Sequence, residues 1–233
     1  MKNTERLVVV TGAGRGVGAA TVQVLVAMPD VRVIAVSRSL DALRTTLGGQ
    51  PNVELVQLDL QAAGSVAALV AHVGQRRLHA LVHNAAVLHK APIGTHQRAD
   101  LEGVFLTNVI APLELSQALA PQLAGDPPGH IVSISSMGGF QDAAKFPGLV
   151  AYSASKAALA CMAQCLAEEY KDVGIRSNCL ALGSVDTEML RAAFPGYQAS
   201  TTAEAMGAYV AEFSLNGHKL FNGKVIPVSA STP

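Results

Sequence analysis

The sequence predicts an α/β fold in which helices cover both faces of a parallel β-sheet. Short apolar runs without polar alternation are separated by longer helix-like segments, and strands that are apolar on both faces are typical of buried parallel sheets. Half of the 233 residues are hydrophobic and only 15% are charged, so both faces can be covered. This length favours one domain, residues 1–233, because two halves would each have a small core.

The expected elements follow one another in a regular order. A first strand at residues 7–10, a helix at 19–28 and a second strand at 31–36 form a βαβ unit. Further strands are expected at residues 53–58, 80–82, 131–134, 177–182 and 224–228, and helices at 65–73, 101–119 and 154–170. Residues 188–215 have a weaker pattern, with Pro195 and Gly196, and are expected to leave the sheet as a helical excursion.

Composition excludes several classes of partner. Lys plus Arg equals Asp plus Glu at 17 each, so no long-range field attracts nucleic acid or an anionic membrane surface. No apolar run reaches the length of a membrane span, and the first residues lack the features of a signal peptide. The three cysteines have no metal-like spacing, and Cys161 and Cys165, one helical turn apart, are expected to pack. We therefore expect a cytoplasmic protein.

A glycine-rich turn follows the first strand. Gly12, Gly16 and Gly18 have the spacing G-x-x-x-G-x-G, with Arg15 and Val17 between them. Glycines here permit a tight turn and a close approach of the backbone to a pyrophosphate, and the next helix offers amide donors and the positive end of its dipole. The turn therefore predicts a doubly wound, Rossmann-type sheet with a dinucleotide at these five residues.

The end of the second strand indicates which dinucleotide is bound. An NAD site usually has Asp or Glu there to accept hydrogen bonds from the ribose 2′-OH, whereas this chain has Ser37 followed by Arg38. A guanidinium can bind a 2′-phosphate through two hydrogen bonds, and Arg15 could reach the same phosphate from the glycine turn. The residues predict NADP(H).

A catalytic group is predicted around Tyr152, Lys156 and Ser136. Tyr152 and Lys156 are four residues apart and project from the same face of a helix. A nearby ammonium and a positive nicotinamide ring favour the phenolate and lower the pKa of the phenol, so Tyr152 could exchange a proton with a carbonyl or alcohol oxygen. Ser136 ends a predicted strand and could hydrogen-bond that oxygen.

With the glycine spacing, this Y-x-x-x-K pair and the strand-terminal serine, the chain resembles the short-chain dehydrogenase/reductase family. The resemblance implies that Asn108 holds a water beside the lysine and extends a proton relay. It also implies several cofactor contacts. These are Asp59 and Leu60 at the adenine, Asn84 and Ala85 along the ribose, and Gly183, Val185 and Thr187 at the nicotinamide. Tyr152 and Lys156 are also expected to contact the cofactor, with the Lys156 ammonium at the nicotinamide ribose hydroxyls.

The chain also departs from the family's pattern. The family's N-N-A-G turn is here His83 to Ala86, and the proline of its P-G segment is Leu182. Ser136 and Tyr152 are 16 positions apart, which indicates an insertion in the loop at residues 137–150. Histidines 83, 89 and 96 do not have the spacing of metal ligands, and no metal is expected.

These features predict an NADP(H)-dependent oxidoreductase that reduces an aldehyde or ketone or, in reverse, oxidises a secondary alcohol. One alternative is a catalytically idle NADP(H)-binding sensor or scaffold. A lyase or epimerase would need a larger C-terminal substrate domain. We expect substrate contacts from residues 137–150 and from a lid at residues 188–215, although the apolar residues of the latter could instead be core that caps the sheet. The resemblance implies a homodimer or homotetramer formed through the long helices.

Overall fold

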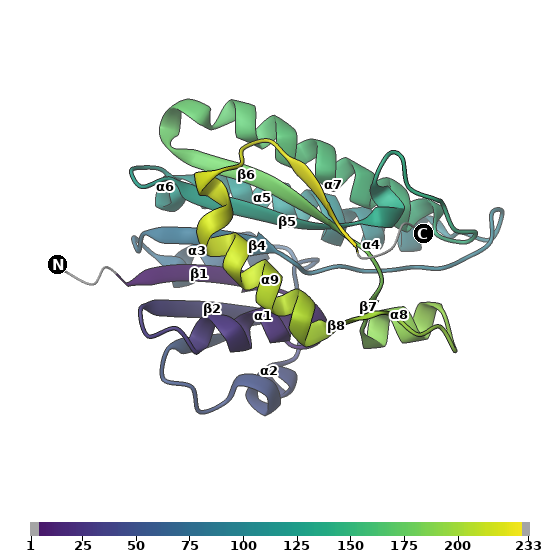
Figure 1. Cartoon of the computed structure of the whole chain (residues 1–233), viewed down its shortest axis with the longest axis horizontal. Coiled ribbons are helices and arrows are strands. Elements are labelled where there is room, and N and C mark those ends of the chain that lie inside the picture. The colour runs from purple at the N-terminus through teal and green to yellow at the C-terminus, as the bar shows by residue number, and fades with distance from the viewer. Residues whose placement is uncertain (1–4, 230–233) are drawn as a thin grey trace.

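The computed structural model describes residues 5–229. Residues 1–4, which belong to the segment expected to lack the features of a signal peptide, lie outside the described residues. Seven parallel strands form the main sheet, in the order β3-β2-β1-β4-β5-β6-β9 (Figure 1). The strands are β1 (Arg6–Thr11), β2 (Val31–Ser37), β3 (Val53–Gln57), β4 (Leu78–His83), β5 (Gly129–Ser136), β6 (Ile175–Leu182) and β9 (Val225–Val228). Two short strands, β7 (Val185–Asp186) and β8 (Thr201–Thr202), pair with each other separately.

Helices lie on both faces of the sheet, as predicted. The α-helices are α1 (Gly16–Val26), α2 (Leu40–Leu47), α3 (Ser65–Val73), α4 (Arg98–Phe105), α5 (Ala111–Ala118), α6 (Ala120–Leu123), α7 (Val150–Glu169), α8 (Glu188–Ala193) and α9 (Ala203–Asn216). A π-helical turn, η1 (Leu106–Ile110), joins α4 to α5. Three 3₁₀ turns are η2 (Met137–Gly139), η3 (Lys171–Val173) and η4 (Gly217–Lys219).

The core shows why these strands lack polar alternation. In β1, Val8 and Val10 belong to an apolar cluster that includes residues of α1, α2 and α9. Leu7 and Val9 point the other way, into a cluster with residues of α3 and α5. Because successive side chains of a strand alternate between faces, a sheet covered on both sides needs apolar residues at every position.

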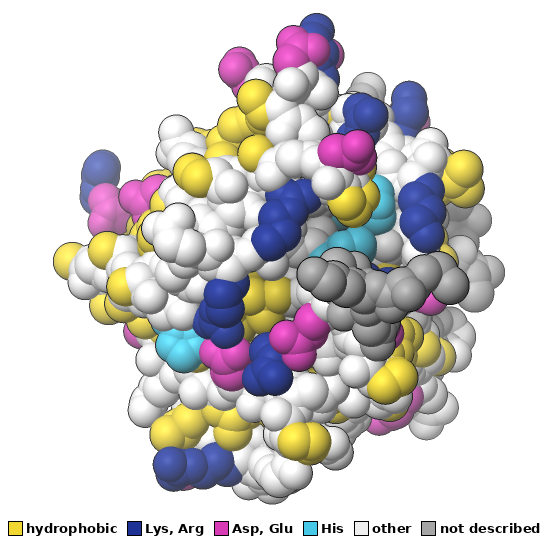
Figure 2. All heavy atoms as spheres, turned by 90° about the vertical axis from the view of Figure 1, so that its left-hand side faces the viewer, with side chains coloured by type: hydrophobic (Ala, Val, Ile, Leu, Met, Phe, Trp, Pro, Cys, Tyr) yellow, Lys and Arg dark blue, Asp and Glu magenta, His cyan; other side chains and the backbone are white. Residues whose placement is uncertain are grey.

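The strand order also fixes where a ligand can bind. The chain winds outward from β1 to β3 in one direction and from β4 to β9 in the other. Connections therefore diverge between β1 and β4, and such a switch point leaves a crevice at the carboxyl ends of the strands. Figure 2 shows the side of the molecule opposite this crevice, where the strands begin. On that side, Lys and Arg side chains are interspersed with Asp and Glu side chains.

The structure corrects two helix assignments. Helix α2 was not predicted, although Ser39 before it is a recognisable N-cap that accepts a hydrogen bond from the Ala42 amide (3.2 Å), and Leu43 and Leu47 are buried. The predicted helix at residues 101–119 is interrupted by the π-helical turn η1. One extra residue in a helical turn leaves no sequence pattern, because the apolar face continues on both sides of it.

The segment expected to be a lid, residues 188–215, divides into two parts. Its second part belongs to α9, where Met206, Val210 and Phe213 are buried in the same cluster as α1. An alanine side chain at Gly207 would lie 2.5 Å from Ala20 Cβ, which shows how closely α9 packs on α1. The buried residues of α9 therefore match the alternative, core that covers the sheet, and the lid stays a prediction for the residues before α9.

Candidate active site

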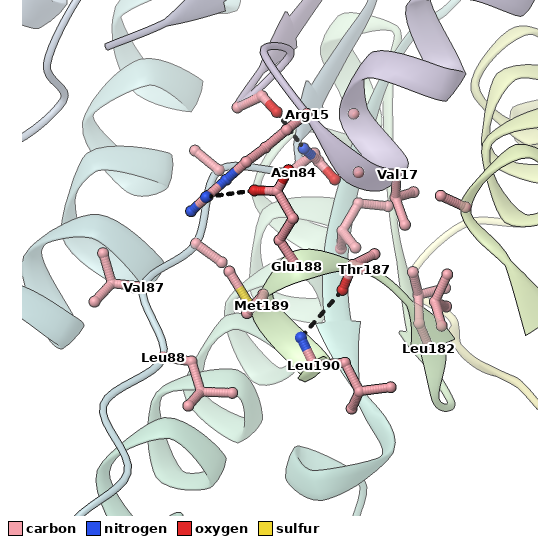
Figure 3. A pocket seen from close by; sticks show the side chains of 18 of the residues that line it. Arg15, Val17, Asn84, Val87, Leu88, Leu182, Thr187, Glu188, Met189 and Leu190 are labelled. Carbon is pink, nitrogen blue, oxygen red and sulfur yellow. Dashed lines mark hydrogen bonds and ion pairs between the residues drawn. The ribbon is translucent and has the colours of Figure 1, made fainter. Parts of the chain in front are cut away.

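A cleft of about 1200 Å³ opens at the carboxyl ends of the strands, where the strand order switches. All of the predicted cofactor residues line it, and so do all of the predicted catalytic residues except Asn108. The glycine turn and the ends of β2 and β4 form one end, and Ser136, Tyr152 and Lys156 lie at the other. Helix α8 borders it on a third side (Figure 3).

The glycine turn at the start of α1 is a close-fitting cradle. Gly12 has a φ of +67°, and a Cβ there would lie 2.7 Å from Ala85 Cα. A Cβ on Gly18 would lie 2.3 Å from Asn84 Nδ2, and Gly16 has a φ of +55°. Sequence reasoning missed Gly14, where a Cβ would lie 2.6 Å from Ser37 Oγ. No side chain caps the first turn of α1, so its amides can face an anion in the cleft.

Asn84 and Thr11 hold this turn against β4. The Asn84 side-chain amide donates to the carbonyls of Thr11 and Gly12, both at 3.0 Å. The Thr11 hydroxyl accepts from the backbone amides of Asn84 and Ala85, both at 3.1 Å, and donates to Val82 O at 3.2 Å. The side-chain amide of Asn84 is therefore engaged in shaping the cradle, and Ala85 and Ala86 line the cleft beside it.

The residues expected to choose the dinucleotide lie together at the same end. Ser37 and the exposed Arg38 line the cleft at the end of β2, and Asp59 and Leu60 line it after β3. The Asp59 carboxylate accepts from the Gln61 amide at 3.0 Å. Arg15 has a partner that the sequence did not predict, because its guanidinium forms an ion pair with Glu188 at 2.9 Å across the cleft (Figure 3).

The lysine predicted to be catalytic is buried and is held by backbone atoms. Lys156 is 2% exposed, and its Nζ donates to Ile134 O at 2.7 Å. The Ser135 hydroxyl donates to Lys156 O at 2.8 Å and ties this turn of α7 to β5. Burial lowers the pKa of Lys156 to about 8, because the charged ammonium loses solvation. Since this value is above 7, the amine is still mainly protonated at neutral pH.

Tyr152 lies in the first turn of α7, with the Lys156 Nζ 5.9 Å from its ring centroid. Burial raises the pKa of the Tyr152 phenol, and a hydrogen bond with the Ser136 hydroxyl opposes that rise. The Ser136 Oγ also accepts from the Gly138 amide at 3.1 Å. The expected lowering of the phenol's pKa is thus not produced by this arrangement alone, in which the loss of solvation outweighs the hydrogen bond with Ser136.

Asn108 is fully buried in the π-helical turn η1. Its Oδ1 accepts from the Val87 amide at 2.8 Å, and its Nδ2 donates to Val87 O and to Ser155 Oγ, both at 2.9 Å. The Ser155 hydroxyl in turn donates to Tyr152 O at 2.7 Å. The side chain therefore locks the loop after β4 to α7. Both hydrogens of its amide are donated within the protein, and the expected water relay stays a prediction.

The segment after β6 closes the cleft. Gly183 donates to Val228 O at 2.9 Å, and a Cβ there would lie 2.4 Å from Ser229 Oγ. Val185 and Thr187 line the cleft, but the Thr187 hydroxyl also accepts from the Leu190 amide at 3.2 Å and caps α8. Of the expected lid, residues of α8 and of the segment after it line the cleft, and so do Ala203 and Glu204 at the start of α9; residues of the loop at 137–150 line it as well.

His83, His89 and His96 contact other side chains. His83 bonds to the Ser116 hydroxyl at 2.9 Å, and the rings of His89 and His96 lie 5.8 Å apart. Within residues 5–229, no group of three or more His, Cys, Asp or Glu side chains is arranged to hold a metal ion. In the same part of the chain, no helix is both long enough and apolar enough to cross a bilayer.

Known proteins share both the sequence pattern and the fold. Protein FixR of Bradyrhizobium diazoefficiens is 34% identical over 196 residues, which cover 79% of this chain and 69% of that protein. A fatty acyl-CoA reductase of Mycobacterium tuberculosis is 30% identical over 212 residues, or 87% of this chain and 71% of that protein.

Two solved structures cover nearly the whole chain. A short chain dehydrogenase from Burkholderia cenocepacia in complex with NADP has a TM-score of 0.86 at 26% identity, over 100% of this chain and 99% of that one. The RhlG/NADP active-site complex of Pseudomonas aeruginosa has a TM-score of 0.84 at 25% identity, over 97% and 96%. A family model described as short chain dehydrogenase matches residues 6–198. The chain therefore belongs to the short-chain dehydrogenase/reductase family of oxidoreductases.

Proposed function

We propose that this protein is a carbonyl reductase that uses NADPH to reduce an aldehyde or ketone, and that can oxidise a secondary alcohol in reverse. One observation carries the proposal. Ser136, Tyr152 and a buried, mainly protonated Lys156 meet at one end of a cleft whose other end is a glycine cradle. A cleft with these two ends suits a dinucleotide whose pyrophosphate lies at the glycine cradle and whose reactive end lies beside a proton donor.

The residues of the cradle fit NADP(H). Positions 12, 16 and 18 leave no room for a Cβ or need positive φ, so backbone can approach a pyrophosphate closely. Arg38 and Arg15 would hold the 2′-phosphate, and no carboxylate occupies the end of β2. The NADP complexes of the Burkholderia and Pseudomonas relatives support this choice. When bound, the cofactor supplies the hydride that reaches the carbonyl carbon.

The side chains at the other end would handle the proton. The Ser136 hydroxyl is expected to hydrogen-bond the carbonyl oxygen, and Tyr152 to give that oxygen its proton as the carbon gains hydride, so that C=O becomes CH–OH. The Lys156 ammonium stabilises the phenolate left behind, which regains a proton from water. General acid catalysis of this kind contributes about 10²–10⁴ to the rate.

An activity screen tests this proposal. NADPH oxidation should be measured over a panel of aldehydes, ketones, diketones and quinones, with NADH in parallel. Turnover with NADPH that exceeds turnover with NADH is the expected result. Tight NADPH binding without turnover of any compound would favour an idle sensor or scaffold instead.

We also propose that residues 188–202 form the mobile part of the substrate lid. The segment includes a six-residue helix and many exposed side chains, features that favour local opening. Hydrogen exchange should show low protection there that rises on addition of NADPH. Protection already equal to that of β5 in the cofactor-free protein would contradict a lid.

The assembly and the location of the protein are proposed together. Helices α5 and α7 expose Leu113 (38%) and Val150 (52%), which supports a homodimer or homotetramer through these helices. Cys161 and Cys165, which were expected to pack, are instead exposed free thiols on α7, and unpaired thiols support a reducing, cytoplasmic location. Light scattering on the purified protein would measure the mass of the assembly, and a monomer would contradict this part of the proposal.

A further inference from the structure

An apolar surface continues the cleft beyond the catalytic tyrosine. We call it the apolar rim, and its residues, all of which line the cleft, are Leu88, Phe146, Leu149, Leu190, Phe194 and Tyr197. Leu149 lies three residues before Tyr152, and its carbonyl accepts from the Ser153 amide at 2.8 Å at the start of α7. Phe146 is joined to Leu149 by a backbone hydrogen bond of 3.3 Å. The rim is therefore continuous with the site of proton transfer.

Aromatic side chains are unusually exposed on this rim. Phe146 is 41% exposed and Tyr197 is 52% exposed, while most large apolar residues of the chain lie in the core. The rings of Phe146 and Phe194 contact each other edge to face, with centroids 5.9 Å apart and planes at 68°. Apolar surface left in water beside a concave site is a typical mark of ligand binding.

Lys90 contacts the Phe194 ring of this aromatic pair and the end of α8. Its Nζ lies 4.1 Å from the centroid of the Phe194 ring and donates to Ala193 O, at the end of α8, at 2.7 Å. A cation over an aromatic face and a cation at a helix C-terminus are both favourable contacts. Lys90 therefore joins the loop after β4 to the end of α8, and its ammonium is directed at protein groups.

Three other charged side chains around this end of the cleft, Glu188, Arg191 and Lys145, are also engaged within the protein. Glu188 pairs with Arg15, Arg191 pairs with Asp186, and the Lys145 ammonium donates to the carbonyls of Phe140 and Ala143. A substrate with a carboxylate or phosphate near the rim would have to break one of these contacts. The rim is thus better suited to an uncharged group.

We propose that the apolar rim binds an uncharged alkyl or aryl tail of the carbonyl substrate, and that Lys90 is a positioning residue that holds Phe194 against that tail. This inference rests on the proposed reductase function. It names the substrate class as apolar aldehydes and ketones whose tails reach from the carbonyl at Tyr152 to Phe146 and Phe194.

The test is the dependence of NADPH-linked kcat/KM on tail length, measured with propanal, hexanal and nonanal. Burial of methylenes should raise kcat/KM by about tenfold or more from propanal to hexanal. Succinic semialdehyde should be reduced at least about tenfold less efficiently than butanal, because its carboxylate has no partner at the rim.

Variants locate the effect on the rim. Phe194→Ala should lower the ratio of kcat/KM for nonanal to that for propanal by about tenfold, whereas Phe221→Ala, a ring packed near Phe213 outside the cleft, should keep the wild-type ratio. Lys90→Met should raise KM for nonanal more than it lowers kcat, and Lys90→Arg should restore the wild-type KM. Failure of Lys90→Arg to restore it would overturn the positioning role of Lys90.

The outcomes separate this inference from the function on which it rests. If propanal is reduced but longer aldehydes gain nothing, or if Phe194→Ala lowers all aldehydes equally, the rim is not a tail site and the reductase proposal survives. If NADPH binds and no carbonyl compound is reduced, the proposed function itself is wrong.

Discussion

The catalytic floor of the cleft and its apolar rim are held together in different ways. The floor consists of Ser136, Tyr152 and Lys156. Lys156 and Asn108, which bonds to the neighbouring Ser155, are buried and bonded to backbone atoms of neighbouring segments. The rim is partly exposed, and its aromatic side chains contact each other and Lys90 across loops. Backbone partners fix positions closely, whereas contacts between exposed side chains can be exchanged one at a time. We infer that the floor sets the reaction and the rim sets the choice of substrate.

The largest effect is expected on the floor. Tyr152→Phe removes the hydroxyl and keeps the ring, so NADPH affinity should remain nearly unchanged while turnover falls at least about a hundredfold. Fluorescence titration and steady-state kinetics measure the two quantities. Near-normal turnover in this variant would show that another group donates the proton.

Lys156→Met should separate activity from stability. Turnover should fall with the loss of the ammonium, but the free energy of unfolding at pH 7 should rise, because burial lowers the pKa of Lys156 from 10.5 to about 8 and the charged form is costly in the fold. An increase in Tm of about 2–5 °C is expected in the cofactor-free protein.

The pH dependence checks the sign of this effect. Between pH 8 and 10.5 the unfolded chain binds more protons at this lysine than the folded chain, so wild-type stability should gain with rising pH in that window. The difference in Tm between Lys156→Met and the wild type should therefore shrink as pH rises from 8 to 10.5. A constant difference would contradict burial of a charged amine.

The preference between NADPH and NADH should depend on the two residues at the end of β2. Ser37→Asp combined with Arg38→Leu adds an acceptor for the ribose 2′-OH and removes a phosphate ligand, so the preference should reverse toward NADH by about tenfold or more. The ratio of kcat/KM for the two cofactors measures it. Arg44→Leu on the adjacent helix α2, where Arg44 lies near Asp41, is the control and should keep the wild-type ratio. A wild type that already prefers NADH would refute the assignment of Arg38.

The smallest effect is expected at the ion pair across the cleft. Under the proposed NADP(H) binding, Glu188 would compete with the 2′-phosphate for Arg15, but both side chains of the pair are 62% exposed, so the contact is weak. Glu188→Gln should tighten NADPH binding about twofold to fivefold and affect NADH less. Asp186→Asn, which changes an acid that pairs with Arg191 instead, is the matched control. Equal gains for both cofactors would mean that Glu188 does not act through Arg15.

The features predicted from sequence are those encoded by neighbouring residues. The βαβ order, the glycine cradle and the pairing of Tyr152 with Lys156 depend on short spacings, which periodicity and turn chemistry reveal. Contacts between distant segments were missed for the same reason. Arg15 and Glu188 are 173 positions apart, and nothing near either residue indicates the other.

The division of residues 188–215 shows the same limit. Met206 and Phe213 have the same apolar character as Phe194, yet the first two pack on α1 and the third lines the cleft. Their composition cannot separate these fates, because the position of α1 decides which apolar face is covered. Likewise, the polar Asn108 was identified, but its three partners follow from the π-helical turn that only the structure shows.

One ratio tests the division between floor and rim most directly, namely kcat/KM for nonanal over kcat/KM for propanal, compared in Tyr152→Phe and Phe194→Ala. Tyr152→Phe should lower both values by at least about a hundredfold and leave their ratio within about twofold of the wild type, because tail binding does not involve the phenol. Phe194→Ala should instead reduce the ratio by about tenfold. A ratio that changes as much in Tyr152→Phe as in Phe194→Ala would contradict the account, since the reaction and the choice of substrate would then depend on the same side chains.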